Sequence, residues 1–417
     1  IDALLCNNVN PVYDYPQAAS FISGLEKTGL TVSFAVQPDE TSALCTYVCP
    51  DSHFLESWND ASPGSGFYSL QQPVIQQLFD TRQVQDSLLK WIGSKDEFHS
   101  IIQSHWKENI HTRQSGYGNF TDFWNHSLQD GVFETGSEPL NQPSISHDGF
   151  KAVMEGTGKT GSPDDIEIQV YESVSMGTGK DSNNPWLMEL PDPVTKLTWD
   201  NAACVSLTLA GKLGLSQGDV VKINDGIELP VIIQPGQAEH TVSIAAGYGR
   251  TVSGKVATGV GANPSPMKSL QEGEILNYSR RAVIVKTGQI AELAQTQEHH
   301  TMEGREIVRE TTLEEYERDR YAGNHHHLHV EEHHTTLYEK PEFDGHHWGL
   351  AVDLNKCIGC SACAIACQSE NNIAVVGKDE VRRRRIMHWI RIDRYYSESP
   401  NDPRVYHQPV MCQHCDN

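Results

Sequence analysis

Four cysteines crowd into eleven residues near the carboxyl end of the sequence, in the order C-I-G-C-S-A-C-A-I-A-C. The spacing C-x2-C-x2-C-x3-C is typical of thiolates that surround an iron–sulfur cluster, and the fourth cysteine of such a run ligates a neighbouring cluster. We therefore expect Cys357, Cys360 and Cys363 to bind one cluster and Cys367 to bind a second.

Structural zinc and disulfide bonds are the alternatives for this run. Zinc sites usually pair one C-x2-C with another such pair roughly 12 to 20 residues away. Here 45 positions separate Cys367 from Cys412, the next cysteine along the chain. The crowding of four cysteines into so short a segment favours iron–sulfur clusters.

A further half motif, M-C-Q-H-C-D-N, stands at the end of the sequence. We interpret its cysteines, Cys412 and Cys415, as ligands of a third cluster. Because more cysteines are needed to complete each cluster, we expect the sequence to be a fragment, or the ordered part, of a longer protein. Its start at Ile1, without Met or a signal segment, points the same way.

Charge and hydropathy restrict the partners that the chain can have. Its 417 residues carry a formal net charge of −23, and an acidic surface repels the phosphates of nucleic acids. The sequence contains no run of about 18 apolar residues, so we expect membrane contact only through partner subunits.

The amino-terminal part, residues 1–145, predicts an α/β domain. Apolar runs over 2–6 and 30–36 flank a helical pattern over 18–28, which gives a β-α-β unit and hence a parallel sheet. Residues 146–297 then predict a closed β-barrel, because short alternating strands follow one another around a single helix, expected over 203–214.

Two further segments complete the predicted order. Residues 298–345 form a histidine-rich connector, which we interpret as a polar wrap; a metal site or a band of proton-binding groups is the alternative. Residues 346–417 predict the start of a ferredoxin-like [4Fe-4S] domain, truncated at Asn417, with a strand over 349–353 leading into Cys357. A G-x-G-x-x-G match over 156–161 lacks a preceding strand and a following helix, so it predicts a solvated loop.

Longer motifs carry a resemblance to known families. N-V-N-P near the start, N-P-W-L-M-E-L-P-D-P, W-D-N and L-G-L-S-Q-G-D-V-V resemble the α/β and dinucleotide-binding domains of the molybdopterin oxidoreductase superfamily. The run from G-H-H-W-G-L-A-V-D-L-N-K-C to M-C-Q-H-C-D-N resembles four-cluster electron-transfer subunits of the polysulfide and nitrite reductase type. Fused in one chain, the two parts resemble the large iron–sulfur subunit of alternative complex III, a bacterial quinol-oxidising respiratory complex.

The resemblance implies an electron-transfer subunit without catalytic residues of its own. The implied cofactors are [4Fe-4S] clusters, with one [3Fe-4S] cluster in the complete protein, and no molybdopterin, because the earlier half of the pterin fold is absent from the sequence. The implied partners are polytopic quinol-binding membrane subunits, c-type cytochrome subunits and a terminal oxidase, and the implied location is the periplasmic face of the bacterial inner membrane. The alternative is a molybdenum-pterin oxidoreductase that reduces an oxyanion or a sulfur compound.

Overall fold

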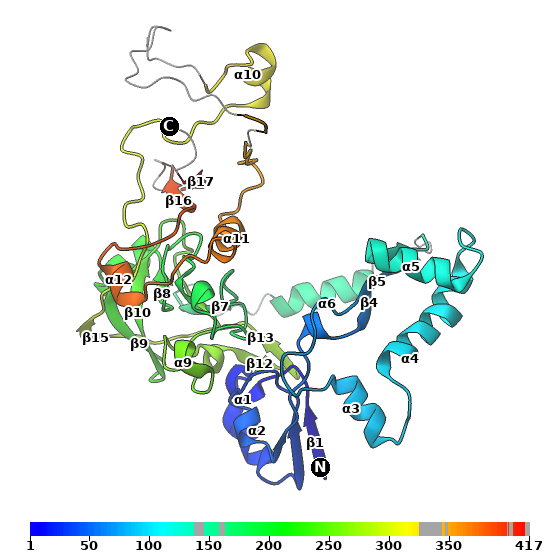
Figure 1. Ribbon diagram of the computed structural model, residues 1–417. Coiled ribbons are helices and arrows are strands. Elements are labelled where there is room, and N and C mark those ends of the chain that lie inside the picture. Colours follow the sequence, from blue (N-terminus) through cyan, green and yellow to red (C-terminus); the bar gives the residue numbers. More distant parts are fainter. Residues whose placement is uncertain are drawn as a thin grey trace. The chain divides into compact units, whose positions relative to one another are not determined.

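The computed structural model describes residues 1–136, 146–157, 162, 164–324, 344–346, 349–397, 399 and 403–412. The chain divides into two compact units, residues 1–161 and 162–417, which are described separately (Figure 1). No helix in the described ranges is long and apolar enough to cross a membrane.

The first unit begins with the predicted β-α-β arrangement. Strand β1 (Ala3–Cys6) pairs in parallel with β2 (Leu30–Ser33), and β2 pairs in parallel with β3 (Tyr47–Val48). Helices α1 (Pro11–Asp14) and α2 (Ala18–Leu25) connect the first two strands. The predicted parallel sheet is therefore confirmed for these three strands.

The rest of the first unit contains helices around an antiparallel sheet. Its core is aromatic: Trp106 and Phe123 are fully buried, and their rings lie 6.0 Å apart. Helix α6 ends within the segment that matches G-x-G-x-x-G, of which residues 158–161 lie outside the described ranges. The strands and helices of this part are β4 (Asn59–Gly64), β5 (Phe67–Gln71), β6 (Val132–Glu134), α3 (Val84–Trp91), α4 (Phe98–His105), α5 (Phe120–Asp130) and α6 (His147–Thr157).

The second unit contains a seven-stranded mixed sheet, which we call the β domain (residues 166–297). Hydrogen bonds join its strands in the order β14-β7-β11-β8-β10-β9-β15, and side chains from most of them meet in one apolar core. No pairing of the end strands β14 and β15 is found among the described residues, so the predicted closed barrel is observed as a sheet with two edges. The strands are β7 (Glu167–Tyr171), β8 (Ala203–Val205), β9 (Asp219–Ile223), β10 (Ile227–Ile233), β11 (Thr241–Ala245), β14 (Tyr278–Ser279) and β15 (Ile284–Ile290).

Short elements complete the β domain. They are helices α7 (Pro185–Glu189), α8 (Leu207–Leu213) and α9 (Gly254–Ala257) and the paired strands β12 (Ser269–Gln271) and β13 (Glu274–Leu276).

The helix expected over 203–214 is shorter than predicted. Residues 203–205 form the buried strand β8, and α8 begins only after Ser206, whose side chain accepts a hydrogen bond from the Leu209 backbone N–H. This is the usual N-cap arrangement. The helix ends at Gly214, which has a left-handed φ of +62°.

The cysteines belong to a segment that we call the cysteine module (residues 349–412). It contains α11 (Ala362–Glu370), α12 (Lys378–Arg382) and an antiparallel hairpin of β16 (Arg391–Tyr396) and β17 (Val405–Val410). The strand predicted over 349–353 is wrong, because these residues form no backbone ladder with another described segment.

The histidine-rich connector between the β domain and the cysteine module is described up to residue 324. It contains helix α10 (Leu313–Arg318). Thr312 and Glu315 form a capping box at the start of this helix. Two of its histidines lie beside the hairpin: the His299 ring is 6.1 Å from the Tyr395 ring, and the His300 ring is 5.8 Å from the Tyr396 ring. The other histidines of the segment fall mostly in 325–343, outside the described ranges.

Candidate metal centre

The cysteine run passes from an irregular loop into a helix. Cys357 and Cys360 lie in the loop before α11, whereas Cys363 and Cys367 lie on the helix itself. Cys363 is exposed and the other three are partly buried, and all four are free thiols. The run is therefore accessible at the surface of the cysteine module.

The loop has a backbone shape that suits an anion. Gly359 and Ser361 adopt left-handed conformations, with φ of +70° and +60°. Such left-handed residues next to right-handed ones turn successive backbone N–H groups toward a common concavity, as in many phosphate and iron–sulfur sites. A cluster held by thiolates is negatively charged, so the left-handed residues of this loop are compatible with its expected occupant.

The thiols of the loop act on one another electrostatically. Burial is the largest cause that raises the pKa of Cys363 above its usual value, while the N–H groups of Ala364 and Cys363 lower it. Negative charge on Cys360 and Cys357 raises the Cys363 pKa further. Three thiolates this close repel one another unless a positively charged group, such as the iron of a cluster, lies between them.

The remaining cysteines of the prediction are only partly placed. The Cys367 sulfur lies 3.6 Å from the side-chain nitrogen of Asn371, the residue that caps the end of α11. Cys412 lies two residues after β17, and Cys415 is outside the described residues. Among the residues that are described, no three His, Cys, Asp or Glu side chains are grouped as ligands of a single metal ion. All three cluster sites therefore stay predictions.

The β16–β17 hairpin packs against the cysteine loop. Gly359 lies directly against the His407 ring, and a Cβ atom at Gly359 would collide with that ring. His407 pairs across the hairpin with Arg394, so their side chains share one face. A glycine is required in the loop at this point, both by the close approach and by the left-handed backbone.

A lysine from the β domain reaches the same hairpin. The Lys196 side chain is 1% exposed, and its Nζ donates a hydrogen bond to the Ile392 carbonyl at 2.6 Å. The pKa of Lys196 is lowered to about 8, and burial is the largest cause. Cys357 is among the negative groups that oppose this lowering. Lys196 is thus mostly protonated at pH 7 and within electrostatic range of the cysteine loop.

Arg394 is buried in the same region. Its Nε donates to the Val194 carbonyl at 2.6 Å, and its guanidinium lies 4.9 Å from the centre of the Tyr396 ring. Its backbone exchanges two hydrogen bonds with the Gln297 side chain, at 2.7 and 2.8 Å. These contacts fix the arginine next to His407 and Lys196.

Buried polar atoms without partners are concentrated around the cysteine run. Five of the nine found in the described residues lie between 368 and 407: both amide atoms of Gln368, Nε2 of His388, Nη1 of Arg394 and Nδ1 of His407. Each buried group left unpaired costs about 1 to 3 kcal/mol. Hydrogen bonds to the sulfurs of an iron–sulfur cluster are common and tune its potential. The residues present therefore fit a cluster, which would accept hydrogen bonds from the nitrogen atoms of this set, whereas Oε1 of Gln368 is itself an acceptor.

The charge of the cysteine module also fits this occupant. Residues 349–412 contain nine Lys and Arg against seven Asp and Glu, a net charge of +2 in a chain whose total is −23. Within the module, part of the positive charge is paired; for example, Arg383 and Arg385 both contact Glu380. A net positive segment in an acidic chain stabilises bound anionic groups.

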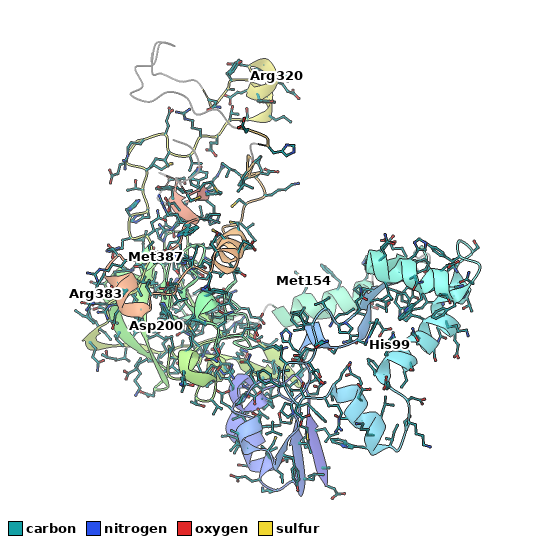
Figure 2. The ribbon with its side chains drawn as sticks, in the orientation of Figure 1. His99, Met154, Asp200, Arg320, Arg383 and Met387 are labelled. Atoms are coloured by element: carbon teal, nitrogen blue, oxygen red, sulfur yellow. The ribbon has the colours of Figure 1, made fainter. Side chains whose placement is uncertain are left out.

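Polar contacts attach the cysteine module to the β domain. The fully buried Glu189 carboxylate accepts hydrogen bonds from the backbone N–H groups of Val376 and Gly377 and from the Trp199 indole, at 2.7 to 3.1 Å. Lys378, at the start of α12, pairs with Asp200 at 2.6 Å. Figure 2 labels Asp200 on the β domain and Arg383 just beyond α12.

The β domain offers little to a pterin dinucleotide. A hollow beside β7 and β11 is lined by Asp192 and Asp200, together with tyrosine, serine and small residues, and by no Lys or Arg of the described chain. Arg250, which follows the glycine-rich turn, donates to the carbonyl oxygens of Gly179 and Val252. A polyanionic cofactor needs positive groups or free N–H groups, so the residues in this hollow do not fit one.

Local sequence patterns did not indicate which residues outside the run contact the cysteine module. Lys196, Glu189 and Gln297 belong to the β-domain region, and their partners lie about a hundred or more positions further along the chain. The one available signal was the sequence H-Q-P-V before Cys412, which places His407 near a cysteine motif.

No family model matches the chain. It is 27% identical over 274 residues to the molybdopterin-binding-like subunit of menaquinone reductase from Nitratidesulfovibrio vulgaris, which covers 63% of this chain and 38% of that protein. It is 36% identical over 69 residues to the iron–sulfur cluster-binding subunit of menaquinone reductase from the same organism, which covers 16% of this chain and 27% of that protein. Among solved structures, acetylene hydratase from Pelobacter acetylenicus aligns with a TM-score of 0.45 at 16% identity, covering 68% of this chain and 44% of that one.

The chain thus spans well under half the length of the two curated relatives. Their similarity supports the expected molybdopterin-oxidoreductase-type fold and the expected iron–sulfur character within one chain.

Proposed function

We propose that the chain is an electron-transfer iron–sulfur subunit of a membrane-bound, quinol-oxidising respiratory complex of the alternative complex III type. When bound, iron–sulfur clusters supply one-electron transfer. The observation that carries the proposal is the cysteine run together with the buried, unpartnered polar atoms of residues 368–407 in the same module. The two relatives, both named as subunits of a menaquinone reductase, support a quinone-linked complex.

Within this proposal the residues have distinct roles. Cys357, Cys360 and Cys363 hold one cluster, Cys367 contributes to a second, and Cys412 with Cys415 begins a third. Glu189 and Lys378 hold the cysteine module on the β domain, so that the distances between electron carriers stay fixed. The proposed partners are quinol-binding membrane subunits, c-type cytochrome subunits and a terminal oxidase, on the periplasmic face of the membrane. We also propose that the β domain binds no molybdopterin.

Electron paramagnetic resonance of the complete complex during titration with quinol tests the proposal. Cys360→Ser and Cys367→Ser should each remove or alter a different signal, because the two thiolates belong to different clusters. Identical spectral losses in the two variants would contradict the assignment of Cys367 to a second cluster. Absence of any iron–sulfur signal in the unmodified complex would contradict the function itself.

Two further measurements define the role of the complex. Metal analysis should find iron without molybdenum or tungsten; about one molybdenum per chain would instead favour the molybdenum-pterin oxidoreductase. Reduction of the clusters by quinol, followed by their oxidation with cytochrome c, should establish the quinol-oxidising direction. If the clusters are reduced only by another donor and then reduce quinone, electrons flow toward the quinone, as the name of the relatives, menaquinone reductase, describes.

A further inference from the structure

Three cationic or potentially cationic side chains lie close together at the hairpin that contacts the cysteine loop. Arg394 and His407 are cross-strand partners on the hairpin, and Lys196 approaches from the β domain. The three act on one another electrostatically: Lys196 and Arg394 both disfavour protonation of His407, and Arg394 disfavours protonation of Lys196. We call these three residues the cationic wall.

The cationic wall touches the loop that carries the first cluster ligands. The His407 ring lies against Gly359, between Cys357 and Cys360, and Lys196 is within electrostatic range of Cys357. Nη1 of Arg394 and Nδ1 of His407 are buried without a partner among the described residues. Because Nδ1 of His407 lies next to Gly359, an acceptor on the loop side would complete the hydrogen bonding of that ring.

We propose that the cationic wall raises the reduction potential of the cluster held by Cys357, Cys360 and Cys363, and that Lys196 makes the β domain part of this control. The inference rests on the proposed function and extends it. Reduction adds negative charge to a cluster, and a fixed positive charge nearby stabilises that reduced form. Because Lys196 and Arg394 are both nearly excluded from solvent, water screens their charge only weakly.

Acidic groups near the cationic wall do not cancel it. Asp192 acts on all three residues, but its carboxylate also accepts hydrogen bonds from the Val194 and Thr195 N–H groups, at 3.0 and 2.8 Å. Asp393 acts on Lys196 and pairs with Arg391 at 3.1 Å. The two buried cations Lys196 and Arg394 therefore have, in Asp192, one nearby carboxylate without a salt bridge of its own among the described residues.

The test is the midpoint potential of the cluster, measured by electron paramagnetic resonance at a series of fixed potentials in the complete complex. Lys196→Met keeps the length of the side chain and removes its charge. We expect its reduction equilibrium constant to fall about tenfold, which is a shift of 59 mV to lower potential for a one-electron couple. Lys196→Arg, which keeps the charge, should stay near the unmodified value, as should Lys212→Met, a matched control at an exposed position of α8.

Iron content and signal shape separate the outcomes. An unmodified complex without an iron–sulfur signal would refute the proposed function. A Lys196→Met complex with full iron and an unchanged potential would overturn only the present inference. If the Lys196→Met complex does not hold the cluster, Asp192→Asn provides the test instead. This substitution removes a negative charge from the same group of residues and should raise the midpoint potential of the cluster. An unchanged potential in that variant would also overturn the inference.

Discussion

The β domain and the cysteine module are held together by different forces. Residues of the β domain fill three of the five apolar core clusters found in the described chain, and none of the five includes a residue from 349–412. Side chains such as Val231 and Ile244 in the β domain are completely excluded from solvent. The cysteine module instead relies on one hairpin, two short helices and polar contacts with its neighbour.

This difference explains where the unsatisfied polar atoms occur. A domain with its own apolar core can pair its buried polar groups during folding, and in the β domain only Ser279 retains a buried side-chain atom without a partner among the described residues. A segment that folds around a cofactor keeps groups whose partners belong to that cofactor. We therefore expect the cysteine module to derive its stability from the proposed clusters and from the β domain, because metal binding can supply folding free energy.

The largest expected effect follows from removing cluster ligands. Replacement of Cys357, Cys360 and Cys363 by Ser should abolish most of the hydrogen-exchange protection of residues 349–412, while strands β7 to β11 keep theirs. The reason is that the cysteine module loses its cofactor and has no apolar core to replace it. Hydrogen exchange read by mass spectrometry measures both regions in one sample.

Cys49→Ser supplies the control for this experiment. Cys49 is a free, partly buried thiol of the first unit and lies far from the run in sequence. Its replacement should leave protection of the cysteine module intact. Persistent protection of residues 349–412 in a triple variant that binds no iron would contradict this difference in stabilisation, because the cysteine module would then fold without clusters.

An intermediate effect should follow from weakening the attachment between the two regions. Glu189→Gln keeps the size of the side chain but replaces one acceptor oxygen by a donor, which faces the N–H groups of Val376 and Gly377. Loss of buried, charge-assisted hydrogen bonds costs about 1 to 3 kcal/mol. Exchange in residues 373–378 should therefore accelerate roughly tenfold to a hundredfold.

Glu228→Gln is the matched control, because Glu228 is exposed on β10. It should change exchange in the cysteine module very little. Equal effects of the two variants would mean that the buried carboxylate does not hold the module on the β domain. Retained iron in Glu189→Gln would show in addition that the attachment and the clusters stabilise the module separately.

The two regions also differ in how much of them the sequence could predict. The short alternating strands predicted within residues 146–297 agree with the observed β7, β9, β10 and β11, because each of these has one face in the core. Strand β8 was mistaken for helix, since its three residues are all buried and such a run has no period of two. The strand expected before Cys357 was wrong because an apolar run alone does not supply a partner strand.

The candidate site was predictable only in its ligands. Cysteine spacing is local information, and it singled out the four residues of the run, whose binding of clusters stays a prediction. The cationic wall depends on packing between residues almost two hundred positions apart, such as Lys196 and Ile392. A lysine in a sequence is expected at the surface, so nothing near Lys196 indicated that it is buried.

The smallest expected effect concerns an ion pair inside the β domain and depends on pH. The nearly buried Asp219 carboxylate accepts hydrogen bonds from Lys286 and from the Ser216 backbone N–H, both at 2.6 Å, and Lys286 is the largest cause that lowers the Asp219 pKa. A carboxyl whose pKa is lower in the folded state contributes stability above its ordinary pKa of 3.8 and loses it as the pH falls through the lower, folded value.

Asp219→Asn should therefore accelerate hydrogen exchange of β9 modestly at pH 6, and the ratio of variant to unmodified rates should approach one as the pH falls below 3.8. Comparing the two proteins at each pH removes the intrinsic pH dependence of exchange. Asp225→Asn is the control, because its 3.6 Å pair with Lys222 is formed by a carboxylate that is 97% exposed, and solvent-screened pairs contribute little. A ratio that stays constant between pH 6 and pH 3 would mean that the Asp219 side chain acts through its shape rather than its charge. The β domain would then be stabilised almost entirely by its apolar core, which would sharpen its contrast with the cysteine module.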